Sequence, residues 1–184
     1  MDQALFDTMT KLEMVSANEG IVSYDSAKFI SILATSKKAK MMVEVGTGVG
    51  YSTLWLGYAA SLTGGKVITC EIEEAKAAQA RANLAEAGLA GYVEVLSGDA
   101  REVLRHRDEP VDLLFIDGDS GQYETYFDVV YKRMGVGSMI IADDVVENDS
   151  ELSDYVTYVQ NHPNLESVTV PVGEGLEVSV KTTE

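Results

Sequence analysis

The stretch MMVEVGTGVGYS (residues 41–52) decides how this chain folds. It opens with a short apolar run that carries one carboxylate, Glu44, and such a run is typical of a buried strand. Three glycines follow at alternate positions, and a segment of helical periodicity comes after them. Glycines in a strand-to-helix turn permit positive φ and let backbone N–H groups approach a ligand. The stretch therefore predicts a strand, a ligand-binding loop and a helix in succession.

Strands and helices alternate along the rest of the chain. Further apolar runs predict strands at 66–71, 92–96, 111–117 and 138–143. Helical patterns cover 51–62, 73–87, 121–134 and 150–162, and the shorter AREVLRHR (100–107). Almost continuously apolar strands suit a parallel sheet covered on both faces, and this alternation favours a doubly wound α/β fold.

The two ends of the chain depart from this alternation. The strands predicted at 165–172 and 176–182 are separated only by GEG (173–175), so we expect an antiparallel hairpin there. Two amphipathic helices, near 2–17 and 24–35, precede the first strand. We expect them to cap the sheet or cover a ligand.

Length and composition predict one domain over residues 1–184, with capping helices in 1–36 and a binding core in 41–184. The net charge of −16 repels phosphate backbones and anionic lipid, which argues against nucleic-acid and membrane partners. Cys70 is the only cysteine, so neither an intrachain disulfide nor a cysteine-rich zinc site is possible. The acidic N-terminus does not resemble a signal peptide, and no apolar run approaches the ~20 residues of a membrane span. We therefore expect a cytoplasmic protein.

The spacing of the glycine loop, Gly46-Thr47-Gly48-Val49-Gly50, distinguishes between nucleotide ligands. A dinucleotide site has the pattern G-x-G-x-x-G, whereas this chain has E-x-G-x-G-x-G. Glu44, two residues before the first glycine, would repel a pyrophosphate but accept a hydrogen bond from an ammonium group. The loop therefore favours a ligand with a cationic end.

Two further carboxylates follow predicted strands. Glu71 ends the second strand, where an acidic side chain can accept both hydroxyls of a ribose. Asp99, in the turn after the third strand, suits an adenine amino group or the N-cap of the following helix. Both roles of Asp99 can coexist.

The segments VEVGTGVGYSTLWL, TCEIEEAKAAQARANLAEAGL, VEVLSGDA, DLLFIDGD and IIADDV together resemble the S-adenosylmethionine-dependent O-methyltransferases. The nearest group is the cation-dependent one that includes catechol and caffeoyl-CoA O-methyltransferases. The resemblance implies a Rossmann-like sheet of seven strands, mostly parallel, with helices on both faces and a reversed terminal hairpin. It also implies S-adenosylmethionine as cofactor and a homodimer.

Carried over residue by residue, the resemblance assigns the cofactor contacts. Glu44, Gly46 and Ser52 would surround the methionine portion, and Glu71 would bind the ribose. The adenine would lie between Asp99 and Ala100, and Asp117 would lie beside the cofactor and a metal ion.

An acidic cluster is expected where the fourth and fifth strands end, at Asp117, Asp143 and Asp144. Neighbouring carboxylates repel one another unless some are protonated or a cation neutralises them. Oxygen ligands suit Mg²⁺, Mn²⁺ or Ca²⁺. The alternative is that these are only polar loop residues, but the resemblance favours a metal site.

This chain departs from the family pattern at two positions. Asp144 stands where asparagine is usual, which adds a negative charge and preserves oxygen coordination. Ser120 stands where catechol-type members have a lysine base. Asp119 or a hydroxide on the cation could replace that base, or the acceptor could be acidic enough to need none.

The main hypothesis is methyl transfer to a hydroxyl of a small aromatic or catechol-like acceptor, with Asp117 and Asp119 as catalytic residues. Tyr123 and Tyr126 either line an aromatic acceptor pocket or pack in the core. Three alternatives remain: a tRNA-nucleoside O-methyltransferase, a cofactor-binding protein with weak or lost activity, and a nicotinamide-dependent oxidoreductase.

Overall fold

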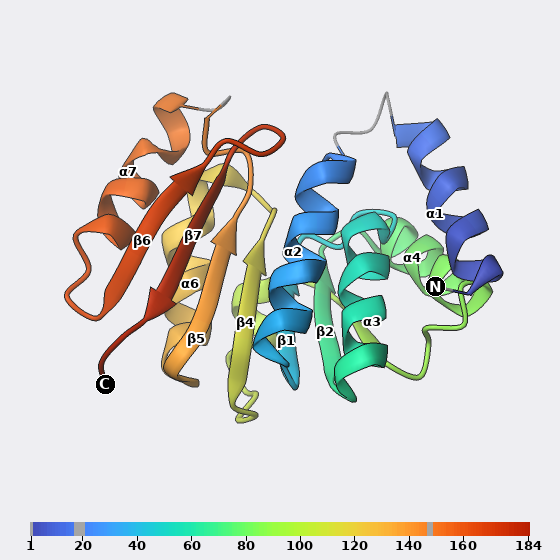
Figure 1. Cartoon of the computed structure of the whole chain (residues 1–184), viewed down its shortest axis with the longest axis horizontal. Coiled ribbons are helices and arrows are strands. Elements are labelled where there is room, and N and C mark those ends of the chain that lie inside the picture. Colours follow the sequence, from blue (N-terminus) through green and yellow to red (C-terminus); the bar gives the residue numbers. More distant parts are fainter. Residues whose placement is uncertain (1, 17–20, 147–148) are drawn as a thin grey trace.

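The computed structural model describes residues 2–16, 21–146 and 149–184. Within these residues, seven strands form one sheet in the order β3-β2-β1-β4-β5-β7-β6, which confirms the predicted fold class (Figure 1). The strands are β1 (Met41–Val45), β2 (Lys66–Glu71), β3 (Val93–Ser97), β4 (Val111–Ile116), β5 (Met134–Ala142), β6 (Leu165–Val170) and β7 (Leu176–Lys181).

The first five strands are parallel, and β7 is antiparallel to both β5 and β6. From β1 the chain runs outward through β2 and β3, and then returns to β4 on the other side of β1. The strand order therefore reverses between β1 and β4, where Val43 pairs with Ile68 on one side and with Leu114 on the other. In an open α/β sheet, a ligand crevice forms at the carboxyl ends of the strands beside such a reversal.

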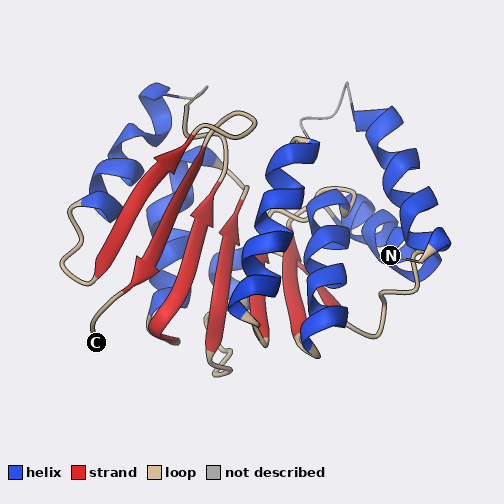
Figure 2. Cartoon of the chain, viewed as in Figure 1, coloured by secondary structure: helices blue, strands red, loops and turns tan. Residues whose placement is uncertain are grey.

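Helices cover both faces of the sheet (Figure 2). They are α1 (Gln3–Ser16), α2 (Tyr24–Lys37), α3 (Tyr51–Thr63), α4 (Glu74–Glu86), α5 (Ala100–Val103), α6 (Tyr123–Tyr131) and α7 (Asp149–Gln160), with a short 3₁₀ helix η1 (Ser120–Gln122). One hydrophobic cluster contains side chains from α1 to α4, and the other contains side chains from α5 to α7. In β1, Met42 belongs to the first cluster while Val43 and Val45 belong to the second, as the alternation of a strand requires. Both faces of β1 are therefore buried.

The structure corrects three predicted boundaries. The helix predicted over 121–134 ends at Tyr131, and the strand predicted from 138 already begins at Met134, because Met134 pairs with Val111 before a register shift. Gly135 thus lies within a strand and does not end a helix. The helix predicted over 100–107 stops at Val103, after which single turns lead to β4.

The two N-terminal helices differ in how they are attached. The N-cap of α2 is Ser23, whose hydroxyl accepts a hydrogen bond from the Ser26 N–H at 3.1 Å. Helix α1 packs against α3 and α4 at one end of the molecule (Figure 1). None of the helices in the described part of the chain is long and apolar enough to cross a membrane.

Candidate functional site

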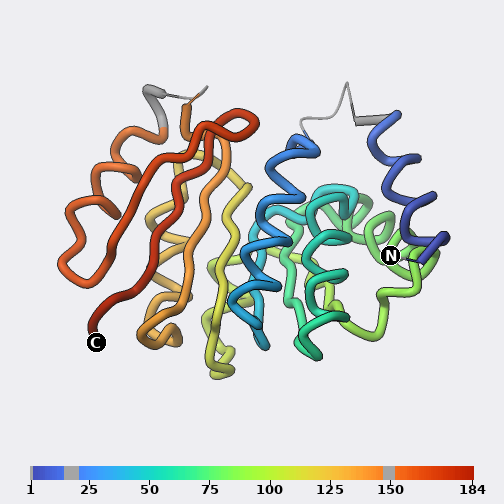
Figure 3. The backbone as a smooth tube through the Cα atoms, in the orientation of Figure 1, coloured from blue at the N-terminus to red at the C-terminus, as the bar shows by residue number. Residues whose placement is uncertain are grey.

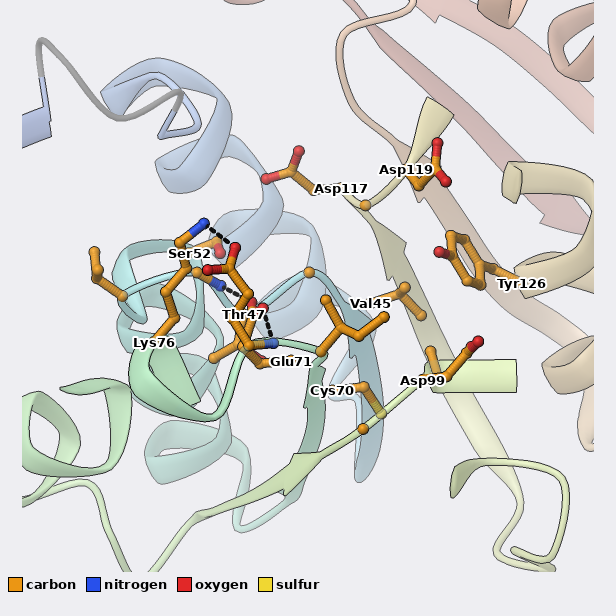
Figure 4. A pocket seen from close by; sticks show the side chains of 18 of the residues that line it. Val45, Thr47, Ser52, Cys70, Glu71, Lys76, Asp99, Asp117, Asp119 and Tyr126 are labelled. Carbon is orange, nitrogen blue, oxygen red and sulfur yellow. Dashed lines mark hydrogen bonds and ion pairs between the residues drawn. The ribbon is translucent and has the colours of Figure 1, made fainter. Parts of the chain in front are cut away.

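A cavity of about 460 Å³ lies at the carboxyl ends of the first four strands, beside the reversal of strand order (Figure 4). Its volume is within the range of about 300–1,000 Å³ that is usual for small-molecule sites. The wall contains nine of the predicted site residues: Gly46, Thr47, Gly48, Ser52, Glu71, Asp99, Ala100, Asp117 and Asp119. The structure therefore brings together most of the residues that the sequence placed around a cofactor.

The three loop glycines have different functions. All have positive φ, with Gly46 at 96°, Gly48 at 52° and Gly50 at 95°. A Cβ on Gly46 would lie 1.9 Å from the backbone oxygen of Asp117, so this glycine lets the ends of β1 and β4 approach. A Cβ on Gly48 would meet nothing within 4 Å. Gly50 is absent from the wall and packs against Ala80 of α4, so we assign it a packing role.

Glu71 ties the glycine loop to the end of β2. One carboxylate oxygen accepts a hydrogen bond from the Gly48 N–H at 2.7 Å, and the other accepts one from the Glu73 N–H at 2.9 Å. Each carboxylate oxygen can accept a second hydrogen bond. Because Glu71 also lines the cavity, its position is compatible with the predicted binding of a ribose diol.

Asp99 forms a local network at the opposite side of the cavity. It caps α5 by accepting a hydrogen bond from the Arg101 N–H at 2.9 Å, and the Arg101 guanidinium binds both of its oxygens. These hydrogen bonds hold the pKa of Asp99 below its usual value. Arg101 also donates to the side chain of Gln122 at 2.9 Å, which connects this end of the cavity to η1. The N-cap role is confirmed, and the contact with adenine stays a prediction.

Glu44 lies behind the cavity wall, in the layer between β1 and α3. It is fully buried and accepts a hydrogen bond from the Thr53 hydroxyl at 2.5 Å, whereas its other oxygen, Oε1, has no hydrogen-bond partner. Burial raises its pKa to about 7, and the hydroxyls of Ser52 and Thr53 partly offset that effect. Ser52 lines the cavity, whereas Glu44 is not among the residues of its wall. The predicted contact between Glu44 and the cofactor stays a prediction.

Three carboxylates form what we call the acidic group: Asp143, Asp144 and Glu174. One oxygen from each lies within 4.8 Å of the others. Asp143 is fully buried, and its Oδ1 accepts a hydrogen bond from the Asp144 N–H at 2.9 Å. Its Oδ2 and the Oε2 of Glu174 are buried without a hydrogen-bond partner. The structure thus brings together two of the three predicted metal ligands and adds a glutamate.

Asp117 lies on the cavity wall and is not among the three residues of the acidic group. It is nevertheless close enough to interact electrostatically with that group. Burial, and then the charges of Asp143 and Asp144, raise the pKa of Asp117 well above its usual value. Burial also raises the pKa of Asp143 to about 7. Carboxylates this crowded are stabilised in their ionised form by a bound cation, and an all-oxygen donor set with two unpartnered buried atoms fits a hard divalent ion.

The sequence left open whether Tyr123 and Tyr126 line the cavity or pack in the core, and the structure gives a different answer for each. Tyr126 lines the cavity, whereas Tyr123 is buried in the core, where it packs edge-on against Tyr155. Sequence reasoning missed Glu174, which it treated only as part of a hairpin turn. Strand β6 runs parallel to β5, so it ends at the same edge of the sheet as the other parallel strands. The sequence could therefore have suggested that the residues of the β6–β7 turn lie near the site. It also missed the wall residues Ile21, Val22, Lys76 and Arg101, which no motif distinguishes.

The chain is similar to known proteins in both sequence and fold. The model of a methyltransferase domain family matches residues 43–145. A catechol O-methyltransferase from Niastella koreensis is 33% identical over 160 residues, which cover 85% of this chain and 72% of that protein. An O-methyltransferase from Bacillus cereus, solved in complex with S-adenosylhomocysteine, is 28% identical with a TM-score of 0.83, covering 99% of this chain and 92% of that one.

A second solved structure carries the methyl donor itself. The O-methyltransferase TomG from Streptomyces achromogenes, involved in tomaymycin synthesis and in complex with S-adenosylmethionine, is 25% identical with a TM-score of 0.84. The match covers 99% of this chain and 91% of TomG. The fold of this chain agrees with that of these two solved O-methyltransferases over nearly its whole length. The chain belongs to the methyltransferase domain family, among the S-adenosylmethionine-dependent O-methyltransferases.

Proposed function

We propose that this protein transfers a methyl group from S-adenosylmethionine to a hydroxyl of a small aromatic or catechol-like acceptor, assisted by a divalent cation. The observation that supports this most is the acidic group beside the cavity, with its buried and unpartnered carboxylate oxygens. Such atoms are costly in a folded protein unless a ligand satisfies them. The catechol O-methyltransferase relative supports the choice of acceptor class.

Methyl transfer requires few chemical groups but a close approach. The acceptor oxygen attacks the methyl carbon in line with the carbon–sulfur bond, the bond to sulfur breaks, and a neutral thioether leaves. Holding both reactants in that alignment supplies much of the rate enhancement. Here Gly48, Glu71 and Asp99 would position the nucleoside part of the cofactor, while the face of the cavity near Asp117 would receive the acceptor.

Asp117, Asp143 and Asp144 would hold the cation, since all offer carboxylate oxygens at the ends of neighbouring strands. A divalent cation there would lower the pKa of the acceptor hydroxyl and orient it. Asp119 is the candidate for receiving the proton, because it lines the cavity and is exposed. Its Oδ1 accepts a hydrogen bond from the Gly121 N–H at 3.2 Å, which fixes the side chain at the start of η1. Ser120, in η1, has no basic group that could do this.

The surroundings of the cavity favour a small aromatic acceptor. Tyr126 contributes an aromatic ring to the wall (Figure 4). The net charge of −16 disfavours polyanionic acceptors such as tRNA or coenzyme A esters. Ser120 in place of a lysine base supports one second candidate, a cofactor-binding protein with weak transferase activity.

The test is a methylation assay with the full chain and S-adenosylmethionine, comparing catechol with phenol as matched acceptors, with Mg²⁺ or with a chelator. We expect methylated catechol in the mass spectrum, formed at least ten-fold faster with Mg²⁺. Asp119→Asn should slow the reaction about 10²-fold or more if Asp119 is the base. Tight binding of S-adenosylhomocysteine without methylation of any hydroxylated acceptor would favour the second candidate.

A further inference from the structure

The turn between β6 and β7 is held in place from two sides. The Val146 N–H donates to the Glu174 carbonyl at 3.0 Å, and the Val145 N–H donates to the Gly175 carbonyl at 3.1 Å. These bonds join the turn to the segment that follows β5, which carries Asp143 and Asp144. The backbone on both sides of Glu174 is therefore fixed relative to the two aspartates.

The glycines that flank Glu174 allow the turn to fit closely. A Cβ on Gly173, whose φ is +57°, would lie 2.2 Å from the Ser26 hydroxyl, and one on Gly175, whose φ is +97°, would lie 2.3 Å from a methyl group of Val146. The Ser26 hydroxyl also donates to the Val172 carbonyl at 3.3 Å. The turn is thus wedged between the start of α2 and the end of β5, at the edge where β4 and β5 end (Figure 3).

This placement delivers the Glu174 carboxylate to two aspartates with the same charge. Its Oε2 is buried and has no hydrogen-bond partner. Oδ2 of Asp143, which is fully buried, likewise lacks a partner. Three like-charged groups directed at one point, two of them with unsatisfied acceptor atoms, are what a positive ligand at that point would stabilise.

The spacing of the oxygens also fits one ion. Two oxygens bound to the same Ca²⁺ or Mn²⁺ at roughly 2.2–2.5 Å can be at most about 5 Å apart. One oxygen from each of the three residues lies within 4.8 Å of the others. The three carboxylates are therefore close enough to share a single cation after small movements of their side chains.

We propose that Glu174 is a ligand of the divalent cation, together with Asp143 and Asp144, so that the site is built from strand ends and the β6–β7 turn. This rests on the proposed cation-assisted function and adds a residue to it. The cation site would then be incomplete without the C-terminal hairpin. With Glu174, the site has a fourth carboxylate beside Asp117, Asp143 and Asp144. It is therefore more negative than the usual ligand set of the family, which has two aspartates and an asparagine.

The test is calorimetric titration of Mn²⁺ into the chelator-treated full chain saturated with S-adenosylhomocysteine. We expect Glu174→Ala to weaken Mn²⁺ binding at least ten-fold, and Glu174→Gln, which keeps one neutral oxygen ligand, to weaken it less. The matched control is Glu166→Gln, an exposed glutamate on β6, which should bind Mn²⁺ like the wild type. Unchanged affinity for S-adenosylhomocysteine in the Glu174 variants would show that they fold and keep the cofactor cavity.

Two outcomes would overturn the proposal, and they differ in what they say about the function. Wild-type affinity for Mn²⁺ in Glu174→Ala, with loss of binding in Asp143→Asn, would exclude Glu174 while leaving the cation site in place. The other outcome is a wild type that binds S-adenosylhomocysteine and methylates catechol but does not bind Mn²⁺. That result would exclude both Glu174 as a metal ligand and the assistance of the reaction by a cation. Should Glu174→Ala fail to fold, Glu174→Gln carries the same comparison.

Discussion

Glu44 combines complete burial with an unsatisfied oxygen, and its protonation is therefore coupled to folding. Because its pKa is raised from about 4.5 in the unfolded chain to about 7 in the folded protein, the folded state holds the proton more tightly. That coupling favours the folded state at low pH, and the advantage disappears as the pH rises through this window. A cationic ligand near Ser52 would favour the ionised form instead.

We predict that Glu44→Gln changes the pH dependence of stability without cofactor. As the pH rises from 4.5 to 7, the free energy of unfolding of the wild type should fall by up to about 3 kcal/mol relative to that of this variant. Each unit of pKa shift corresponds to about 1.4 kcal/mol. Urea unfolding at pH 5 and pH 8 measures the difference, with the exposed Glu166→Gln as control. A stability difference that is the same at both pH values would contradict the assignment.

The loop between β1 and α3 depends on its glycines for two separable reasons. Gly46 must lack a Cβ because the end of β4 lies against it, whereas Gly48 faces open space and only adopts a positive φ. A positive φ alone costs a non-glycine residue roughly 1–2 kcal/mol. Contact with a backbone oxygen at 1.9 Å cannot be relieved without separating β1 from β4.

We therefore predict that Gly46→Ala destabilises the protein by at least about 3 kcal/mol, whereas Gly48→Ala costs only about 1–2 kcal/mol. Chemical denaturation of both variants provides the measurement, and each serves as the control for the other. Equal losses would mean that the approach of β4 to Gly46 is not what requires the glycine.

The described part of the chain also has a large apolar groove, separate from the cofactor cavity. It lies between α1, α2 and α3, has a volume of about 800 Å³, and is bordered by Phe6, Ile32 and Leu62, each more than half exposed. Its charged lining residues are Glu13 and Lys28, which balance each other in a chain whose net charge is −16. A neutral apolar region is where two such acidic molecules would associate with least repulsion.

We propose that the expected homodimer forms through this groove. Ile32→Glu should shift the protein toward monomer in analytical ultracentrifugation, and added salt should strengthen the wild-type dimer by screening its net charge. Val136→Glu, at an equally exposed valine on β5, is the matched control. A wild type that stays monomeric at high concentration, or an Ile32→Glu dimer of unchanged affinity, would contradict this.

The fold and the position of the cofactor cavity could be predicted because they depend on local patterns and on one rule of topology. Apolar runs at regular intervals specify parallel strands, and the residues that follow such strands meet at one edge of the sheet. This reasoning places Glu71 and Asp99 at the ligand edge and Asp117 in an acidic cluster there, whereas the position of Asp117 beside the cofactor came from the family resemblance. The start of β5 at Met134 was missed, because pairing with Val111 outweighed the local preference for a helix ending at Gly135.

What the amino-acid sequence determined alone is the alternation of elements, the glycine loop and the acidic ends of the strands, since each depends on residues close together in the chain. The tertiary structure decided which carboxylates meet. Glu174 lies near Asp143 because β7 pairs with β5 and because Gly173 and Gly175 let the β6–β7 turn pack closely against α2 and Val146. Glu44 lies behind the wall because the strand's alternation and the packing of α3 turn its side chain into the core. Side-chain directions at these positions depend on packing between distant segments, which no local pattern encodes.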